Sequence, residues 1–232
     1  MATTNDPHAR DIQVESDDGA FAGYVAVPAA GHGPGLLVLQ EWWGLVPHIR
    51  NVCDRLARAG FVALAPDLYR GESTTDPDAA GRLMMNLEIQ RAGRDLGAAV
   101  DALRRQPETD GTAIGCIGFC MGGQLALYAA CSKEEIKAVV DCYGVHPEVS
   151  LDFSGCRARI LGLFAENDDF IPVSAVEALG DALEEADLPH TLVTYEGVQH
   201  AFLNEDRPDV YDAVVAARAW HDIETFLKAE LL

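Results

Sequence analysis

Apolar and polar residues alternate in two stretches near the beginning of the 232-residue chain, 11–16 and 21–27. The turn residues Asp17-Asp18-Gly19 lie between them. This pattern predicts an antiparallel hairpin with one face on the core and one face in water. Further along, short segments are apolar almost throughout, as in strands that are covered on both faces. We predict such strands over residues 35–40, 61–65, 113–118, 138–142, 160–165 and 191–195.

Segments with helical periodicity separate these apolar strands. Strands that alternate with helices imply right-handed crossovers and an α/β fold, with a mostly parallel, doubly wound sheet and helices on both faces. No Pro/Ser-rich linker or change of composition interrupts the chain, so we expect one domain over residues 1–232. The predicted helices cover about 47–59, 78–105, 122–131, 173–186 and 208–231, and Gly93 is where the second could break.

The stretch from Ala113 to Gly123 predicts a buried strand that runs into a glycine-bounded turn and then into a helix. Its centre is Cys120, in the pattern Gly-x-Cys-x-Gly-Gly. This is the pattern of a nucleophile elbow with sulfur in place of the usual serine oxygen. The glycines allow strand and helix to approach closely and tolerate a strained backbone. The helix N-terminus that follows favours a thiolate or a developing oxyanion.

The alternative for Cys120 is a structural role, because free cysteines are often buried in cores. We expect that role for Cys116, Cys131 and Cys142. For Cys120, the apolar strand before it, the paired glycines after it and the helix beyond them favour the nucleophile. Zinc binding by Cys116 and Cys120 is not expected, because these residues straddle the change from strand to turn.

A cysteine nucleophile needs a base, and that base needs an acid that fixes its tautomer. His200 is the candidate base because it lies between the last predicted strand and the final helix, whereas His48 and His146 are more typical of caps or loop contacts. The acid is Asp168 or Asp169, which share one loop. We choose Asp168 because an Asp-x-x-x-Pro spacing begins there, which resembles the acid loop of α/β-hydrolases. Asp169 would then be an exposed neighbour.

The charge balance bears on the partners of the protein. The chain has 17 Lys and Arg residues against 37 Asp and Glu residues, a formal net charge of −20. Nucleic acids and anionic membrane surfaces would repel such a protein, so we expect small-molecule partners. Three lysines stand beside fourteen arginines, a composition that fits either salt adaptation or a GC-rich genome.

The sequence also bears on location. Residues 1–6 have neither the basic nor the apolar region of a secretory signal, and no apolar run approaches the ~18 residues of a membrane span. Six cysteines without a C-x-x-C pair fit reduced thiols better than a disulfide framework. We therefore expect a cytoplasmic protein.

Nearly the whole chain resembles the dienelactone hydrolase (carboxymethylenebutenolidase) family of α/β-hydrolases. The resemblance rests on Gln40-Glu41-Trp42-Trp43-Gly44 with Ile49-Arg50 after it, Ala65-Pro66-Asp67-Leu68-Tyr69, Gly118-Phe119-Cys120-Met121-Gly122-Gly123, Asp168 to Pro172 and Gly197 to Phe202. It implies the α/β-hydrolase fold and a triad of Cys120, Asp168 and His200. Glu41 would match the family's buried glutamate, which contacts the resting thiol and helps to activate it when substrate enters. A solvated surface glutamate is the alternative.

An acyl intermediate needs backbone N–H donors that are already in place around its oxyanion. Met121, the residue after the nucleophile, would supply one, and by position and family likeness Trp42 would supply the other. Aromatic residues could wall an apolar acyl pocket or belong to the core, and this choice stays open for Trp42, Trp43, Tyr143, Phe170 and Phe202.

One position departs from the founding dienelactone hydrolases. Those enzymes place an arginine soon after the catalytic histidine to hold the substrate carboxylate, whereas this chain has Asn204 there and its nearest arginine is Arg207. A carboxylate that is buried without a cation pays a large desolvation penalty. We therefore expect neutral substrates, unless Arg82 or Arg207 reaches the pocket.

Together these features predict a hydrolase that opens lactones or carboxylic esters through an acyl-thioester on Cys120, with water completing the turnover. No metal or organic cofactor is expected, and the sequence allows a monomer or a homodimer. A thioesterase or acyltransferase on the same triad is one alternative. A non-catalytic or redox-sensing protein that binds small molecules is another, although it would have no need of a complete triad.

Overall fold

The computed structural model describes residues 6–232. Residues 1–5, part of the stretch where no secretory signal is expected, lie outside the described residues. Strands β1 (His8–Val14) and β2 (Phe21–Val27) pair antiparallel, from His8 opposite Val27 to Val14 opposite Phe21. The predicted hairpin is therefore confirmed, although its first strand begins three residues earlier and ends two residues earlier than the sequence pattern indicated.

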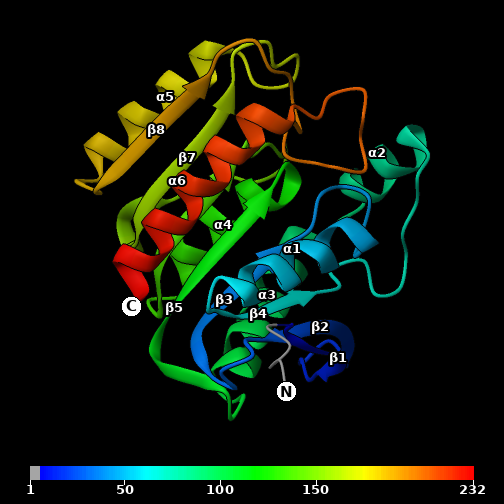
Figure 1. Ribbon diagram of the computed structural model, residues 1–232. Helices are drawn as coiled ribbons and strands as arrows, with labels where there is room; N and C mark the ends of the chain where they lie inside the picture. The colour runs from blue at the N-terminus through cyan, green and yellow to red at the C-terminus, as the bar shows by residue number, and fades with distance from the viewer. Residues whose placement is uncertain (1–5) are drawn as a thin grey trace.

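Within residues 6–232, eight strands form one sheet in the order β1-β2-β4-β3-β5-β6-β7-β8 (Figure 1). β2 pairs antiparallel with β4, and every pair beyond it is parallel. The mostly parallel α/β sheet is thus confirmed. The remaining strands are β3 (Gly33–Leu39), β4 (Val62–Pro66), β5 (Thr109–Phe119), β6 (Ile136–Cys142), β7 (Arg159–Ala165) and β8 (His190–Tyr195).

Helices cover both faces of the sheet, as predicted. α1 (Pro47–Arg58) and α6 (Ala213–Leu231) bury their apolar residues in a core on one face. α3 (Ile89–Arg104), α4 (Met121–Ser132) and α5 (Val173–Glu185) contribute to a second core on the other face. In the described part of the chain, none of the helices is long and apolar enough to cross a membrane.

Two helix boundaries differ from the prediction. The helix expected over 78–105 is two helices, α2 (Pro77–Met85) and α3, and the chain breaks between them rather than at Gly93. Gly93 lies inside α3, where a Cβ atom would come within 3.0 Å of the Tyr128 ring, so this glycine serves close packing against α4. The last helix begins only after Asp212, whose side chain accepts the N–H groups of residues 214 and 215.

The parallel strands all end at the same edge of the sheet. The connections that follow β3, β5, β6, β7 and β8 leave from this edge. In open α/β sheets, ligands bind in the crevice outside these carboxyl ends. The candidate residues Glu41, Cys120, Asp168 and His200 all lie just beyond such strand ends.

Candidate active site

Cys120 occupies a sharp, strained turn between β5 and α4. Its backbone has φ 53° and ψ −121°, a conformation that non-glycine residues rarely adopt. A Cβ atom on Gly118 would collide with the Gly122 carbonyl, and one on Gly122 would lie 2.5 Å from the Leu39 and Gln40 carbonyl oxygens. The elbow therefore needs glycine at these positions, in agreement with the sequence interpretation.

The structure brings the three predicted triad residues together. Asp168 Oδ2 lies 2.8 Å from His200 Nδ1, and His200 lines the same cavity as Cys120, which is near enough to act on the imidazole. Asp168 is held in place because its Oδ1 accepts the N–H groups of Phe170 at 2.8 Å and Ile171 at 3.0 Å. Asp169 points to solvent at the rim of the site. The geometry thus favours Asp168 as the partner of the histidine.

His200 is poised to carry a positive charge. Burial alone would lower the pKa of His200, but its hydrogen bond with Asp168 and its interactions with Cys120 raise that pKa to about 10. The His200 imidazole therefore binds a proton readily at neutral pH.

A cavity of about 600 Å³ opens above the sulfur of Cys120. Trp42 and Trp43 wall it on one side, with their rings edge to face at 5.1 Å between centroids. Phe170, whose side chain is 58% exposed, closes it on another side and packs 5.0 Å from the His200 ring. These three aromatic residues therefore line the cavity, as the sequence allowed.

For Tyr143 and Phe202, candidates for the pocket wall, the structure favours the core alternative. Both side chains are fully buried and neither lines the cavity. The Tyr143 ring packs behind His200 at 5.1 Å between centroids, and Phe202 packs behind Tyr143 at 5.6 Å. These rings therefore support the imidazole from the core side.

Glu41 is buried rather than solvated, so the surface alternative is wrong. Its side chain is 1% exposed and lines the same cavity as Cys120. Glu41 Oε2 accepts a hydrogen bond of 2.6 Å from Asn204 Nδ2, and no described residue donates a hydrogen bond to Glu41 Oε1. No hydrogen bond joins Glu41 to Cys120 within residues 6–232.

Asn204 does not stand in the substrate cavity. It is 2% exposed and anchors Glu41 from the core side. Arg207 lines the cavity instead, and its guanidinium is already paired with Asp209 through bonds of 3.0 and 2.6 Å. Arg82 is exposed on α2 and is not part of the cavity wall. Any cationic contact with a substrate would therefore come from Arg207.

The two expected oxyanion donors lie at the proper chain positions. Met121 is the first residue of α4, and its buried sulfur accepts a hydrogen bond of 3.1 Å from the Tyr69 hydroxyl. Within the described chain, the backbone N–H groups of Met121 and Trp42 have no hydrogen-bond partner. Both N–H groups are thus free to bind an oxyanion.

Neither alternative histidine reaches the cavity. His48 lies buried in α1 against the Phe119 ring, and His146 is buried in the loop after β6, where its Nδ1 accepts the Glu148 N–H. Among the residues that the structure describes, no group of three or more His, Cys, Asp or Glu side chains could hold a metal ion.

Sequence reasoning missed Asp141, the residue before the last of β6, whose Oδ1 lies next to Gly123 of the elbow. We predicted this segment only as a buried strand. Asp141 is 1% exposed and pairs in register with Gly118. An aspartate within an apolar strand next to the nucleophile strand is a signal that could have been noticed.

The strand order, the elbow after β5 and the histidine after β8 define the protein as an α/β-hydrolase. Residues 21–231 match the profile of the dienelactone hydrolase family. The chain therefore belongs to the dienelactone hydrolase family, a family of hydrolases.

Several known proteins are similar over nearly the full length of the chain. Protein usf of Aquifex pyrophilus is 36% identical over 227 residues, covering 95% of this chain and 98% of its own. An Aquifex aeolicus protein, provisionally named a carboxymethylenebutenolidase, is 34% identical with the same coverage. The solved structure of a dienelactone hydrolase-like promiscuous phosphotriesterase from metagenomic libraries has a TM-score of 0.89 and 25% identity, covering 98% of this chain and 100% of its own.

Proposed function

We propose that this protein hydrolyses neutral carboxylic esters or lactones through an acyl-thioester on Cys120, without a metal or organic cofactor. The observation that carries the proposal is the hydrogen bond between His200 and Asp168 beside the strained Cys120, in a cavity with aromatic walls. The family match supports hydrolysis as the reaction class.

In the first half of the reaction, the Cys120 thiolate adds to the substrate carbonyl carbon, and the carbonyl oxygen becomes an oxyanion. The free N–H groups of Met121 and Trp42 would stabilise that charge. The intermediate collapses when the carbon–oxygen bond to the alkoxy group breaks, and His200 donates its proton to the departing oxygen. In a lactone this oxygen stays attached to the acyl-enzyme as a free hydroxyl.

In the second half, a water molecule attacks the thioester. His200 takes a proton from that water, the carbon–sulfur bond breaks, and the carboxylic acid leaves while the thiolate–imidazolium pair forms again. Asp168 keeps His200 in one orientation through both halves because its second oxygen is fixed by two backbone N–H groups.

Glu41 would act on the thiol from the cavity wall. Its Oε1 has no partner among the described residues. Burial raises the pKa of the Cys142 and Tyr143 side chains, and the charge of Glu41 raises both further, at Cys142 after the larger effect of the Asp141 charge. A carboxylate that influences its neighbours in this way would discourage a permanent thiolate and protect the resting sulfur from oxidation. Asn204 would hold Glu41 in that place.

The substrate is expected to be neutral, because the one arginine of the cavity wall within residues 6–232 is paired with Asp209. A cytoplasmic location is part of the same proposal, and the six free cysteines support it. Whether the protein acts as a monomer or a homodimer does not alter the chemistry.

The alternatives make different predictions in one experiment. An ester or lactone hydrolase turns over p-nitrophenyl acetate and loses that activity when iodoacetamide alkylates the cysteine, with substrate protecting against the alkylation. A non-catalytic binding protein would be alkylated without any turnover to lose. A thioesterase or acyltransferase would prefer acyl-thioesters, or an added alcohol as acceptor, over simple esters and water.

A further inference from the structure

Asp141 lies in an unusual position beneath the nucleophile elbow. It is 1% exposed, and its strand neighbour in β5 is Gly118, at the start of the elbow. Its Oδ1 lies so close to Gly123 of α4 and to Gly144 that a Cβ atom on either glycine would collide with it. Glycine at these two positions therefore leaves the space that the carboxyl group occupies.

This carboxyl group lacks the partners that a buried charge needs. Neither of its oxygens accepts a well-formed hydrogen bond from any described residue. The titratable groups that interact with it are His200 from the loop after β8 and Cys142 on its own strand, and Glu41 acts on Cys142 as well. Cys120 of the elbow adjoins this strand end, because its backbone N–H donates to the Cys142 carbonyl. Of these groups, only the side chain of His200 can bear a positive charge.

Burial raises the pKa of Asp141 to about 7, although the Gly144 N–H and the charge of His200 lower it in part. The group can therefore change its charge in the range where an enzyme of this kind works. Its position decides which neighbours would respond to that change.

We propose that Asp141 is a positioning residue whose carboxyl group, by gaining or losing its proton beneath the elbow, tunes the Cys120–His200 pair. This inference rests on the proposed function of Cys120 as the nucleophile. In the neutral form, the N-terminus of α4 acts on the thiolate and on the oxyanion alone. In the ionised form, the negative charge of Asp141 lies in a low-dielectric surrounding. It destabilises the thiolate and the oxyanion and holds the proton on His200.

The direction of the pH effect follows from the sign of the charge. As pH rises through neutrality, Asp141 ionises, the negative transition state becomes less stable and the rate falls relative to an enzyme that lacks this group. Asp141→Asn keeps the shape of the side chain and stays neutral. The informative quantity is therefore the ratio of kcat/KM in this variant to kcat/KM in the parent, because titrations common to both cancel.

We expect this ratio, measured with p-nitrophenyl acetate, to be near one at about pH 5.5 and to rise to roughly tenfold at about pH 8.5. The alkylation rate of Cys120 by iodoacetamide should change in the same sense. A ratio that stays constant with pH would overturn the proposal. If the parent shows no esterase activity, the proposed function fails, whereas the alkylation profile still tests Asp141.

Thermal unfolding provides a second test, because the direction of the change in melting temperature does not depend on catalysis. The pKa of this acid is higher in the folded state than its ordinary value of 3.8. The folded protein thus holds the proton that the unfolded chain releases, and folded-state stability is lost as pH rises from about 4 to about 7. Asp141→Asn removes that loss, so its melting temperature should match the parent at about pH 4 and exceed it by several degrees at about pH 8.

Asp95→Asn is the matched control, because Asp95 is equally buried but has ionic partners. This variant should melt below the parent at about pH 8. An Asp141→Asn protein that also melts below the parent at that pH would contradict the proposal, because a paired, structural carboxylate would then be the better account.

Discussion

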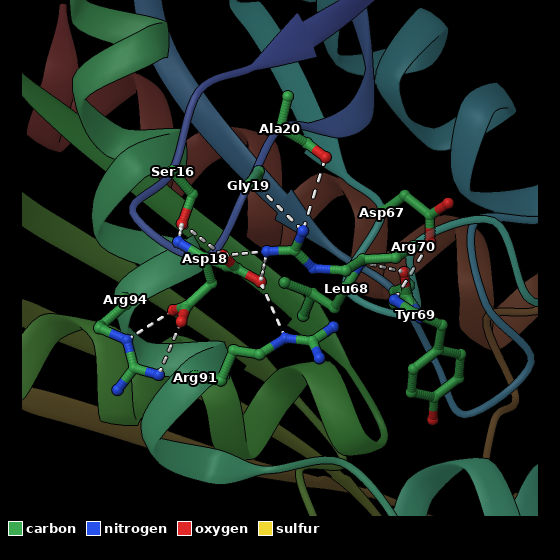
Figure 2. A network of polar contacts seen from close by, with 12 residues as sticks. Ser16, Asp18, Gly19, Ala20, Asp67, Leu68, Tyr69, Arg70, Arg91 and Arg94 are labelled. Carbon is green, nitrogen blue, oxygen red and sulfur yellow. Dashed lines mark hydrogen bonds and ion pairs between the residues drawn. The ribbon is translucent and has the colours of Figure 1, made fainter.

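Two regions of the molecule bury carboxylates in opposite ways. The first, here called the arginine network, consists of Ser16, Asp18, Arg70, Arg91, Arg94 and Asp95 and joins the β1–β2 turn to α3. Figure 2 shows Arg70, Arg91 and Arg94 converging on this turn beside Ser16 and Asp18. Asp95 accepts hydrogen bonds from Ser16 at 2.7 Å and from Arg70 at 2.8 and 3.0 Å.

The second region, the elbow, contains Glu41, Cys120, Asp141, Tyr143 and His200. Here Glu41 Oε1, both Asp141 oxygens and the Tyr143 hydroxyl lack a well-formed hydrogen bond to any of the described residues. A buried polar group without a partner costs stability, so a fold keeps it only where something offsets that cost. The arginine network therefore serves structure, whereas the elbow keeps its polar groups available for chemistry.

The largest effect should come from the proposed nucleophile and base of the elbow. Cys120→Ala and His200→Ala should each lower kcat for p-nitrophenyl acetate by roughly 10⁴-fold or more, and the double variant should lose little beyond that, because the two residues act as one unit. Asp18→Asn in the arginine network should retain parental kcat. Losses that add in the double variant would show that the two residues do not share one step.

The proposed acid, Asp168, should give the next largest effect. Asp168→Asn should lower kcat by roughly 10²–10⁴-fold, because the histidine loses the group that fixes its tautomer. Asp169→Asn alters an exposed neighbour and should stay within a fewfold of the parent. The assignment of Asp168 is wrong if Asp169→Asn proves the more damaging of the two.

For stability, the larger loss should come from the arginine network rather than from the elbow. Asp95→Asn leaves Arg70 without its buried partner, so the free energy of unfolding should fall by about 3 kcal/mol at neutral pH. Urea denaturation of the parent, Asp95→Asn and Asp141→Asn measures this directly. Equal losses in the two variants would remove the distinction between the two regions.

The smallest effect concerns substrate charge. Arg207 is paired with Asp209, so the parent should prefer a neutral ester over its carboxylated analogue. Asp209→Asn frees the guanidinium and should narrow that gap in kcat/KM by roughly 1–3 kcal/mol, the value of a charged hydrogen bond. A parent that already prefers the carboxylated ester would show that Arg207 binds substrate despite its pairing.

Features that depend on neighbouring residues could be predicted from the sequence. The hairpin around Gly19 and the elbow at Cys120 are both local, because turn glycines and the strand pattern lie within a few residues of one another. The positions of Cys120, Asp168 and His200 after predicted strands also allowed us to place them near one another, because parallel strands end at the same edge of the sheet.

Features that depend on packing between distant segments could not be predicted. The hydrogen bond from Asn204 to Glu41 joins residues 163 positions apart, and no local pattern points to it. Tyr143 and Phe202 face the core because of how the β6 and β8 connections pack around His200. The role of Gly93 likewise became visible only through its contact with Tyr128.

The central claim is that Cys120 carries the acyl group, and mass spectrometry of the enzyme quenched with acid during turnover tests it most directly. With p-nitrophenyl acetate, the account predicts one acetyl group on the peptide that contains Cys120, and its accumulation in a variant with slowed deacylation. Cys120→Ala should show neither the adduct nor the burst of p-nitrophenol. An acetyl group on another residue, or a burst that persists in Cys120→Ala, would contradict the account.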